Sequence, residues 1–179
     1  MGEGKRKMNP NLPENMNNDM NPADKLQEIQ TFLTGQEFQV YTGEDKEYEY
    51  LDEGYYCITL RNTKGNPLYI DLTDEFTLTY KGYWHCHYNP DSRGYSEMLH
   101  DLRGLLDNKL LVLNIFSKER WECSSSLDFD YATVADIDRQ ISMLPKEIVR
   151  RIKQDGAEIR LQFWDEDKSK IIRLEPDEK

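Results

Sequence analysis

The 179-residue sequence predicts a single α+β domain with a largely antiparallel sheet of about seven or eight strands and three to four helices. Two patterns give this prediction. Several short segments alternate apolar and polar residues, as half-buried strands do, and others repeat apolar residues every three or four positions, as amphipathic helices do. We expect residues 1–20 to be a disordered N-terminal tail, residues 21–175 the domain, and residues 176–179 a charged tail.

The N-terminal part of the domain is expected to begin with a helix. Asn21 is a favourable N-cap, Pro22 suits the first helical position, and Gly35 is a typical helix stop. Alternating apolar residues then predict strands at residues 38–40, 56–60 and 68–72. A three-residue turn at Thr73–Glu75 would pair Leu72 with Phe76 and join their apolar faces.

Residues 75–88, EFTLTYKGYWHCHY, carry the longest alternation in the chain, with the large apolar groups at even positions. A two-residue turn at Lys81-Gly82 is one interpretation. It would expel Trp84 from the apolar face and turn the two following histidines inward. A continuous strand, bent or bulged at Gly82, keeps every large apolar side chain on one side. We therefore predict the continuous strand.

The C-terminal part is expected to alternate helices and strands. Apolar residues from Tyr95 to Leu106 follow the helical i, i+3, i+4, i+7 spacing, so a helix over 95–107 should pack on one face of the sheet. Leu110–Phe116 is apolar on both faces apart from Asn114, as a central strand is. The remaining expected elements are a strand at 121–127, a helix with a capping box of Thr133 and Asp136, a helix starting at Pro145, and strands at 157–164 and 171–174.

The charge of the chain is strongly negative and uneven. Its 34 acidic and 23 basic residues give −11, which disfavours binding to a nucleic-acid backbone and favours a basic protein partner. The three cysteines lack the spacing of a disulfide framework or a CxxC motif, which suits a reducing compartment. No apolar run approaches the roughly 20 residues that span a bilayer, so we expect no membrane contact and a cytoplasmic location.

Residues 44–53, EDKEYEYLDE, form the most acidic segment and the main candidate site. One interpretation is a solvated hairpin whose charges keep an edge strand from pairing with other chains. The other is a contact surface, because acidic clusters steer basic partners and tyrosine is enriched at interfaces. The predicted partner-binding residues are Glu44, Asp45, Glu47, Tyr48, Glu49, Tyr50, Asp52, Glu53 and Tyr55.

His85 and His87 suggest an alternative function. An H-x-H spacing in a strand places both imidazoles on one face, roughly 6–7 Å apart, so that both could bind one zinc ion. A catalytic zinc needs a third protein ligand, and the candidates are His100 and an acidic residue, neither of which a motif places. Cys86 lies between the two histidines, but we do not expect it to act as a catalytic nucleophile with either of them, because its side chain should face away from both. Apart from zinc in this alternative, no cofactor is predicted.

The basic residues Arg150, Arg151 and Lys153 are interpreted as a solvated helix face rather than a nucleic-acid patch, given the charge around them. The chain also lacks the glycine-rich phosphate loops and the G-x-S-x-G context of a nucleophile elbow. Catalysis is therefore not indicated by any motif.

The order of elements over residues 75–131 resembles that of small acidic bacterial proteins of the immunity type, which are encoded beside polymorphic toxins. The likeness comprises a strand ending in W-H-C-H-Y at Trp84–Tyr88, then N-P-D, an amphipathic helix and a wholly apolar strand. The resemblance implies a single α+β domain that neutralises a toxin, often a nuclease, by covering it without catalysis. The leading hypothesis is thus a non-enzymatic inhibitor of a basic protein. The alternatives are a metal-binding module or metal-assisted hydrolase at the two histidines, and a structural or regulatory interaction domain.

Overall fold

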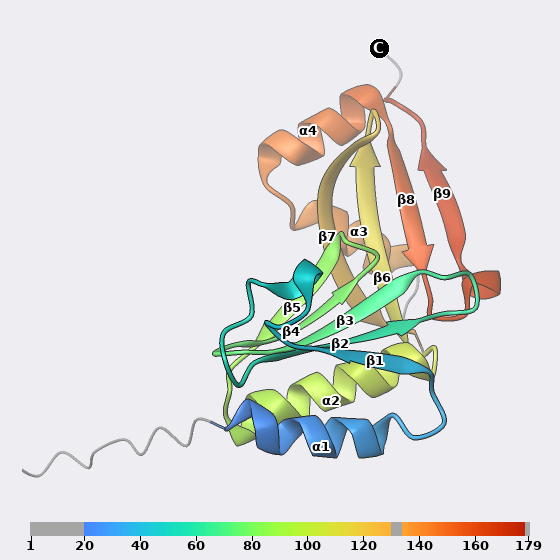
Figure 1. Ribbon diagram of the computed structural model, residues 1–179. Coiled ribbons are helices and arrows are strands. Elements are labelled where there is room, and N and C mark those ends of the chain that lie inside the picture. The colour runs from blue at the N-terminus through green and yellow to red at the C-terminus, as the bar shows by residue number, and fades with distance from the viewer. Residues whose placement is uncertain (1–19, 130–133, 178–179) are drawn as a thin grey trace, which may run out of the picture.

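The computed structural model describes residues 20–129 and 134–177. Over these residues the chain forms one α+β body with nine antiparallel strands in two sheets and four α-helices (Figure 1). The α+β class and the antiparallel pairing are therefore confirmed. The strands are nine rather than seven or eight, and they are divided between two sheets.

The first sheet is a five-stranded meander that contains the N-terminal strands in chain order. Its strands are β1 (Phe38–Tyr41), β2 (Tyr56–Arg61), β3 (Pro67–Leu72), β4 (Phe76–Tyr80) and β5 (Trp84–Tyr88). Helices α1 (Pro22–Phe32) and α2 (Ser92–Leu106) cover one face of this sheet (Figure 1). The packing of the predicted 95–107 helix on a sheet is thus confirmed, as is the Asn21 N-cap, whose side chain accepts a hydrogen bond from the Ala23 N–H.

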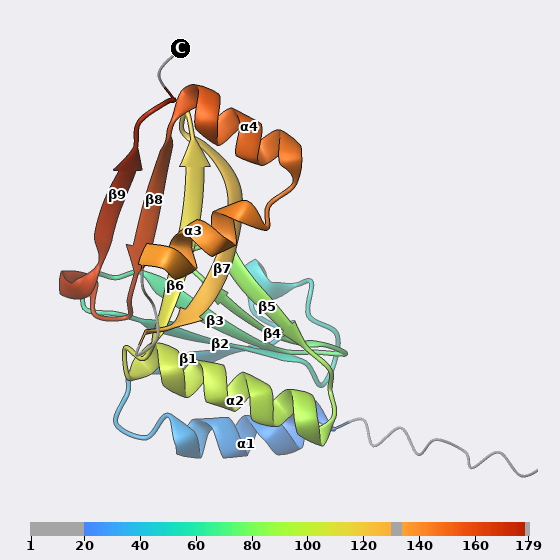
Figure 2. The ribbon, with the colours of Figure 1, turned by 180° about the vertical axis from the view of Figure 1, so that it is seen from behind.

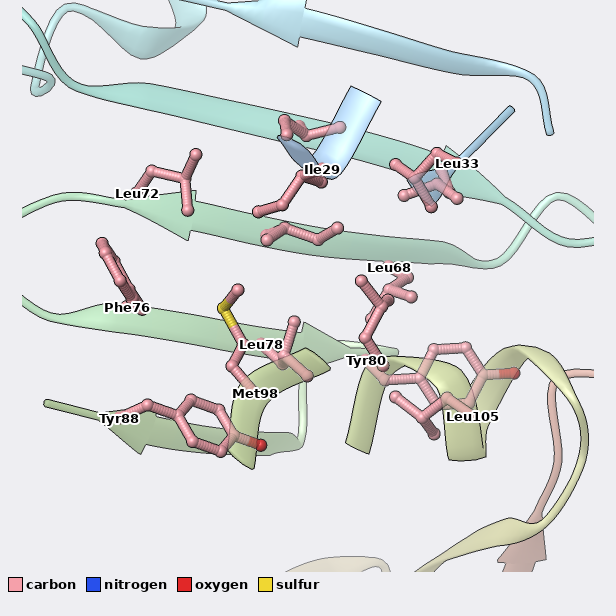
Figure 3. Close-up of a cluster of buried hydrophobic side chains, with 14 of the residues drawn as sticks. Ile29, Leu33, Leu68, Leu72, Phe76, Leu78, Tyr80, Tyr88, Met98 and Leu105 are labelled. Atoms are coloured by element: carbon pink, nitrogen blue, oxygen red, sulfur yellow. The ribbon is translucent and has the colours of Figure 1, made fainter. Parts of the chain in front are cut away.

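The larger core lies between the first sheet and these two helices. Ile29 of α1, Leu33 at the C-cap of that helix and Met98 of α2 are fully buried against apolar residues of β2, β3 and β4 (Figure 3). The alternation within each strand explains this core, because inward residues of neighbouring strands stand opposite one another. Leu72 pairs with Phe76, as the predicted turn at Thr73–Glu75 requires.

The continuous strand predicted over residues 75–88 is wrong. The chain folds back after Tyr80, and β4 and β5 form a hairpin in which Tyr80 pairs with Trp84. The turn has three residues, and both Lys81 (φ 55°) and Gly82 (φ 74°) adopt left-handed backbone conformations. An odd-length turn preserves the alternation, so the even residues of both strands still face the core and Trp84 is only 3% exposed.

The second sheet has the order β7-β6-β8-β9. Its strands are β6 (Leu110–Ser117), β7 (Arg120–Asp128), β8 (Ala157–Gln162) and β9 (Lys170–Leu174). β6 is interior, as its apolar sequence predicts, and it is paired on both sides. Helices α3 (Val134–Ser142) and α4 (Lys146–Asp155) cover one face and enclose a second core that includes Leu113, Ile152 and Ile159 (Figure 2).

The two sheets are joined by a polar junction around one carboxylate oxygen. Oε1 of Glu166, from the β8–β9 connection, lies 2.6 Å from Lys81 Nζ and accepts hydrogen bonds from Tyr80 and Asn62, both at 3.0 Å. The Tyr80 hydroxyl also lies 2.7 Å from the Phe163 carbonyl oxygen. The tip of the β4–β5 hairpin is therefore tied to the second sheet.

Some predictions fall where the structure gives no description. Thr133 of the predicted capping box lies outside the described residues, so that prediction is not tested. The same holds for nearly all of the predicted tail (residues 1–20) and for the last residues of the predicted charged tail. None of the described helices combines the length and apolar character that crossing a membrane requires.

Candidate interaction surface

The acidic segment predicted as a hairpin is a compact loop. Residues 42–55, which we call the acidic loop, connect β1 to β2 and contain a single 3-10 turn, η1 (Lys46–Tyr48). Thr42 and Asp45 close its first half: the Asp45 N–H donates to the Thr42 carbonyl (3.0 Å), and the Thr42 N–H donates to Asp45 Oδ2 (2.8 Å). The flanking strands pair as predicted, but the acidic residues themselves are not part of them.

Leu51 anchors the acidic loop to the body of the protein. Its side chain is 5% exposed, and its N–H donates to the Tyr48 carbonyl (2.9 Å). The chain also passes very close to itself here, since a Cβ atom added to Gly43 would lie 2.2 Å from the Leu51 carbonyl oxygen. Only glycine fits at that position, so the loop has a defined shape despite its polar sequence.

The tyrosines of the acidic loop differ in how far they are available to a partner. Tyr48 stacks on Tyr41 of β1 with ring centroids 4.1 Å apart, and its hydroxyl lies 3.5 Å from Thr59 Oγ1. Tyr50 is the most exposed, at 67%. Tyr55 hydrogen-bonds Asp74 and is half-buried. Tyr50 therefore leaves most of its surface exposed, beside the stacked rings of Tyr41 and Tyr48.

All six acidic side chains of the acidic loop are exposed, and none forms an ion pair with any residue that the structure describes. Lys46 is the only base within the loop. Their charges thus remain available to attract a cationic surface, an effect that ionic strength screens.

A polar cluster beneath the acidic loop was not predicted. Cys57 of β2 and Asp71 of β3 are directly paired in the sheet, and Asp71 Oδ1 is buried without a hydrogen-bond partner among the described residues. Burial raises the pKa of Asp71 above its ordinary value. Burial, and then the Asp71 carboxylate, raise the pKa of Tyr50 above its ordinary value. No sequence signal could have found this cluster, because residues of a polar strand face are normally solvated.

The predicted histidine pair lies on the outer face of the first sheet. His85 and His87 are exposed, with ring centroids 5.2 Å apart in an edge-to-face arrangement. His87 Nδ1 lies 2.9 Å from Glu75 Oε2. Cys86 faces the core side, as predicted.

His100 lies on α2, and the described residues contain no group of three histidine, cysteine or acidic side chains that could hold a metal ion. Among the described residues, the zinc hypothesis is therefore supported only by the His85 and His87 pair, which no third ligand joins. The acidic loop provides a better-defined feature, because its charges are concentrated and its backbone shape is fixed.

No protein family, curated protein or solved structure matches this chain.

Proposed function

We propose that this protein is a non-enzymatic binding protein of the immunity type, which docks a basic protein, a cognate toxin, through the acidic loop. The observation that carries the proposal is the set of six exposed carboxylates without ion-pair partners in the described structure, held on a loop of fixed shape. A preformed loop lowers the ordering cost of binding, and unpaired charges lose no internal ion pairs when a partner arrives.

The carboxylates and the tyrosines have different roles in this proposal. Long-range attraction by the carboxylates speeds encounter, because complementary charge raises association rates well above the ordinary 10⁵–10⁶ M⁻¹s⁻¹. Tyr50 anchors the contact: an exposed tyrosine that becomes buried contributes area at a low conformational cost. Tyr48, stacked on Tyr41, supports Tyr50 from behind, since the rings of Tyr48 and Tyr50 are 6.0 Å apart.

The direct experiment co-purifies the chain with the basic protein encoded by a neighbouring gene and measures their association rate at increasing salt concentration. The Debye length falls from about 10 Å at 0.1 M to about 3 Å at 1 M, so the association rate should fall steeply. Changing the six loop acids to their amides should lower the association rate at least about tenfold at low salt and leave dissociation nearly unchanged. The asparagine that replaces Asp45 retains an oxygen for the Thr42 N–H.

A matched control removes six exposed acids elsewhere, with the same four glutamates and two aspartates. This control variant changes Asp24, Glu37, Glu119, Glu147, Glu175 and Asp177 to their amides. It should reduce the association rate much less than the loop variant does. Equal effects would show that net charge alone acts, and an association rate indifferent to salt would remove the acidic loop from the interface.

A further inference from the structure

A surface hollow lies at the end of the molecule that carries α4, and none of its lining residues belongs to the acidic loop. It has a volume of about 730 Å³ and is bordered by α4 and by the chain leading into it. Figure 2 shows α4 at the end of the second sheet remote from α1 and α2. Its lining combines apolar Leu144 and Val149 with the cations Lys146, Arg150 and Lys153.

These three cations form a stripe along α4, because positions i, i+4 and i+7 of a helix lie on one face. None of them forms an ion pair with the part of the chain that the structure describes. Arg151 behaves differently: its Nε lies 3.1 Å from Glu122 Oε1, so it is tied to β7. The basic face predicted as one solvated group is thus divided between a structural arginine and an unpaired stripe.

The stripe is unfavourable for the isolated helix. Like charges four residues apart repel, and Lys146 stands in the first turn, where the helix dipole already disfavours a cation. The two acids that line the hollow do little to offset the repulsion among the three cations. Asp155 is held by Lys118, 2.7 Å away, and the exposed Asp177 forms no ion pair with any residue that the structure describes.

We propose that this hollow, which we call the α4 groove, is a second binding site that takes an acidic peptide segment of a partner protein. The occupant's carboxylates pair with the three cations, and an apolar side chain of the occupant packs on Leu144 and Val149. The site is separate from the acidic loop and does not depend on its proposed function.

Charge and symmetry favour this occupant over two others. The acidic loop of a second copy has suitable charge, but that contact is head-to-tail, and repetition at both ends of every molecule leads to open chains unless a ring closes. A nucleic acid would meet only three unpaired cations on a chain of net charge −11, and its backbone would gain nothing from the apolar residues of the groove.

The test measures fluorescence anisotropy with a labelled peptide built from Glu-Glu-Leu repeats, using the full chain. Arg150→Glu/Lys153→Glu should weaken binding at least about tenfold. Lys168→Glu/Lys170→Glu makes the same change in charge at two exposed lysines away from the groove, and should weaken binding less than about threefold. Thermal unfolding of both variants checks that they are folded, and Arg150→Gln/Lys153→Gln provides a milder second variant, expected to give an intermediate loss.

Several results would overturn the proposal. The proposal fails if the peptide does not bind the wild-type chain, or if both glutamate variants weaken binding equally. It also fails if a peptide with serine in place of leucine binds the wild-type chain with the same affinity as the original peptide. Tighter binding of a single-stranded DNA oligomer would assign the cations to nucleic acid instead. Concentration-dependent self-association in sedimentation experiments, abolished by Arg150→Glu/Lys153→Glu, would identify a second copy as the occupant.

Discussion

Changing Glu166 to glutamine tests whether charge holds the junction between the two sheets. The Glu166 carboxylate lies 2.6 Å from the Lys81 ammonium, and the two side chains are only 15% and 12% exposed. Glutamine has nearly the same shape without the charge. Lys81 would then keep its positive charge with little access to water and no counter-ion at that distance.

The expected loss follows from this partial burial. Removing one partner of a buried ion pair costs about 3–5 kcal/mol, whereas an exposed pair contributes about 0–1 kcal/mol. The glutamine oxygen can still accept hydrogen bonds from Asn62 and Tyr80, and Lys81 retains some contact with water. We therefore expect the free energy of unfolding to fall by about 2–3 kcal/mol, which lowers Tm by roughly 5–10 °C for a chain of this length.

Urea unfolding, followed by tryptophan fluorescence and circular dichroism, measures this change. Glu97→Gln is the matched control, because it removes an exposed ion pair with Arg93 (2.9 Å) within α2 and should cost less than about 0.5 kcal/mol. Adding Lys81→Met to the Glu166→Gln variant should recover part of the loss, since it removes the uncompensated charge. A Glu166→Gln variant as stable as Glu97→Gln would refute a role for this charge pair.

Two further predictions concern the acidic loop and the buried Asp71 of β3 beneath it. Gly43→Ala should displace the loop, because the new Cβ would lie 2.2 Å from the Leu51 carbonyl oxygen. We expect the free energy of unfolding to fall by about 1–3 kcal/mol and the loop amides to exchange hydrogen faster. Unchanged exchange rates would contradict this prediction. Asp71→Asn should alter the pH dependence of stability. The pKa of Asp71 is raised in the folded protein from its ordinary 3.8. The stability that the protonated carboxyl contributes is therefore fully present below pH 3.8 and is lost as pH rises through the folded pKa. The wild-type chain should therefore lose stability relative to Asp71→Asn over this range in urea titrations, and parallel pH profiles would exclude the effect.

The β4–β5 hairpin shows why alternation alone could not locate a turn. A three-residue turn returns the chain with its inward and outward positions unchanged, so Tyr80 and Trp84 face the same side whether or not the strand is continuous. Only the rejected two-residue turn would have reversed the faces. The contacts that hold the turn, notably Lys81 with Glu166, come from a distant part of the sequence.

The candidate surface was predicted in part. Composition identified the acidic density, and the structure places all six acids at the surface. The features that shape the loop, Leu51 against Gly43 and the buried Asp71 beneath it, depend on close approaches that periodicity does not report. Likewise, a basic run on a helix does not reveal that Arg151 turns to Glu122 while Arg150 borders a groove.

The sequence by itself determined the type of most elements, which residues of each face inward, and where negative charge is concentrated. These properties depend on near neighbours in the chain, since side-chain direction repeats every two residues in strands and about every 3.6 in helices. The tertiary structure alone decided that the strands divide into two sheets and that Glu166 joins them, 86 positions from its hydrogen-bond partner Tyr80. Such choices depend on contacts between distant segments, which local patterns permit but do not specify.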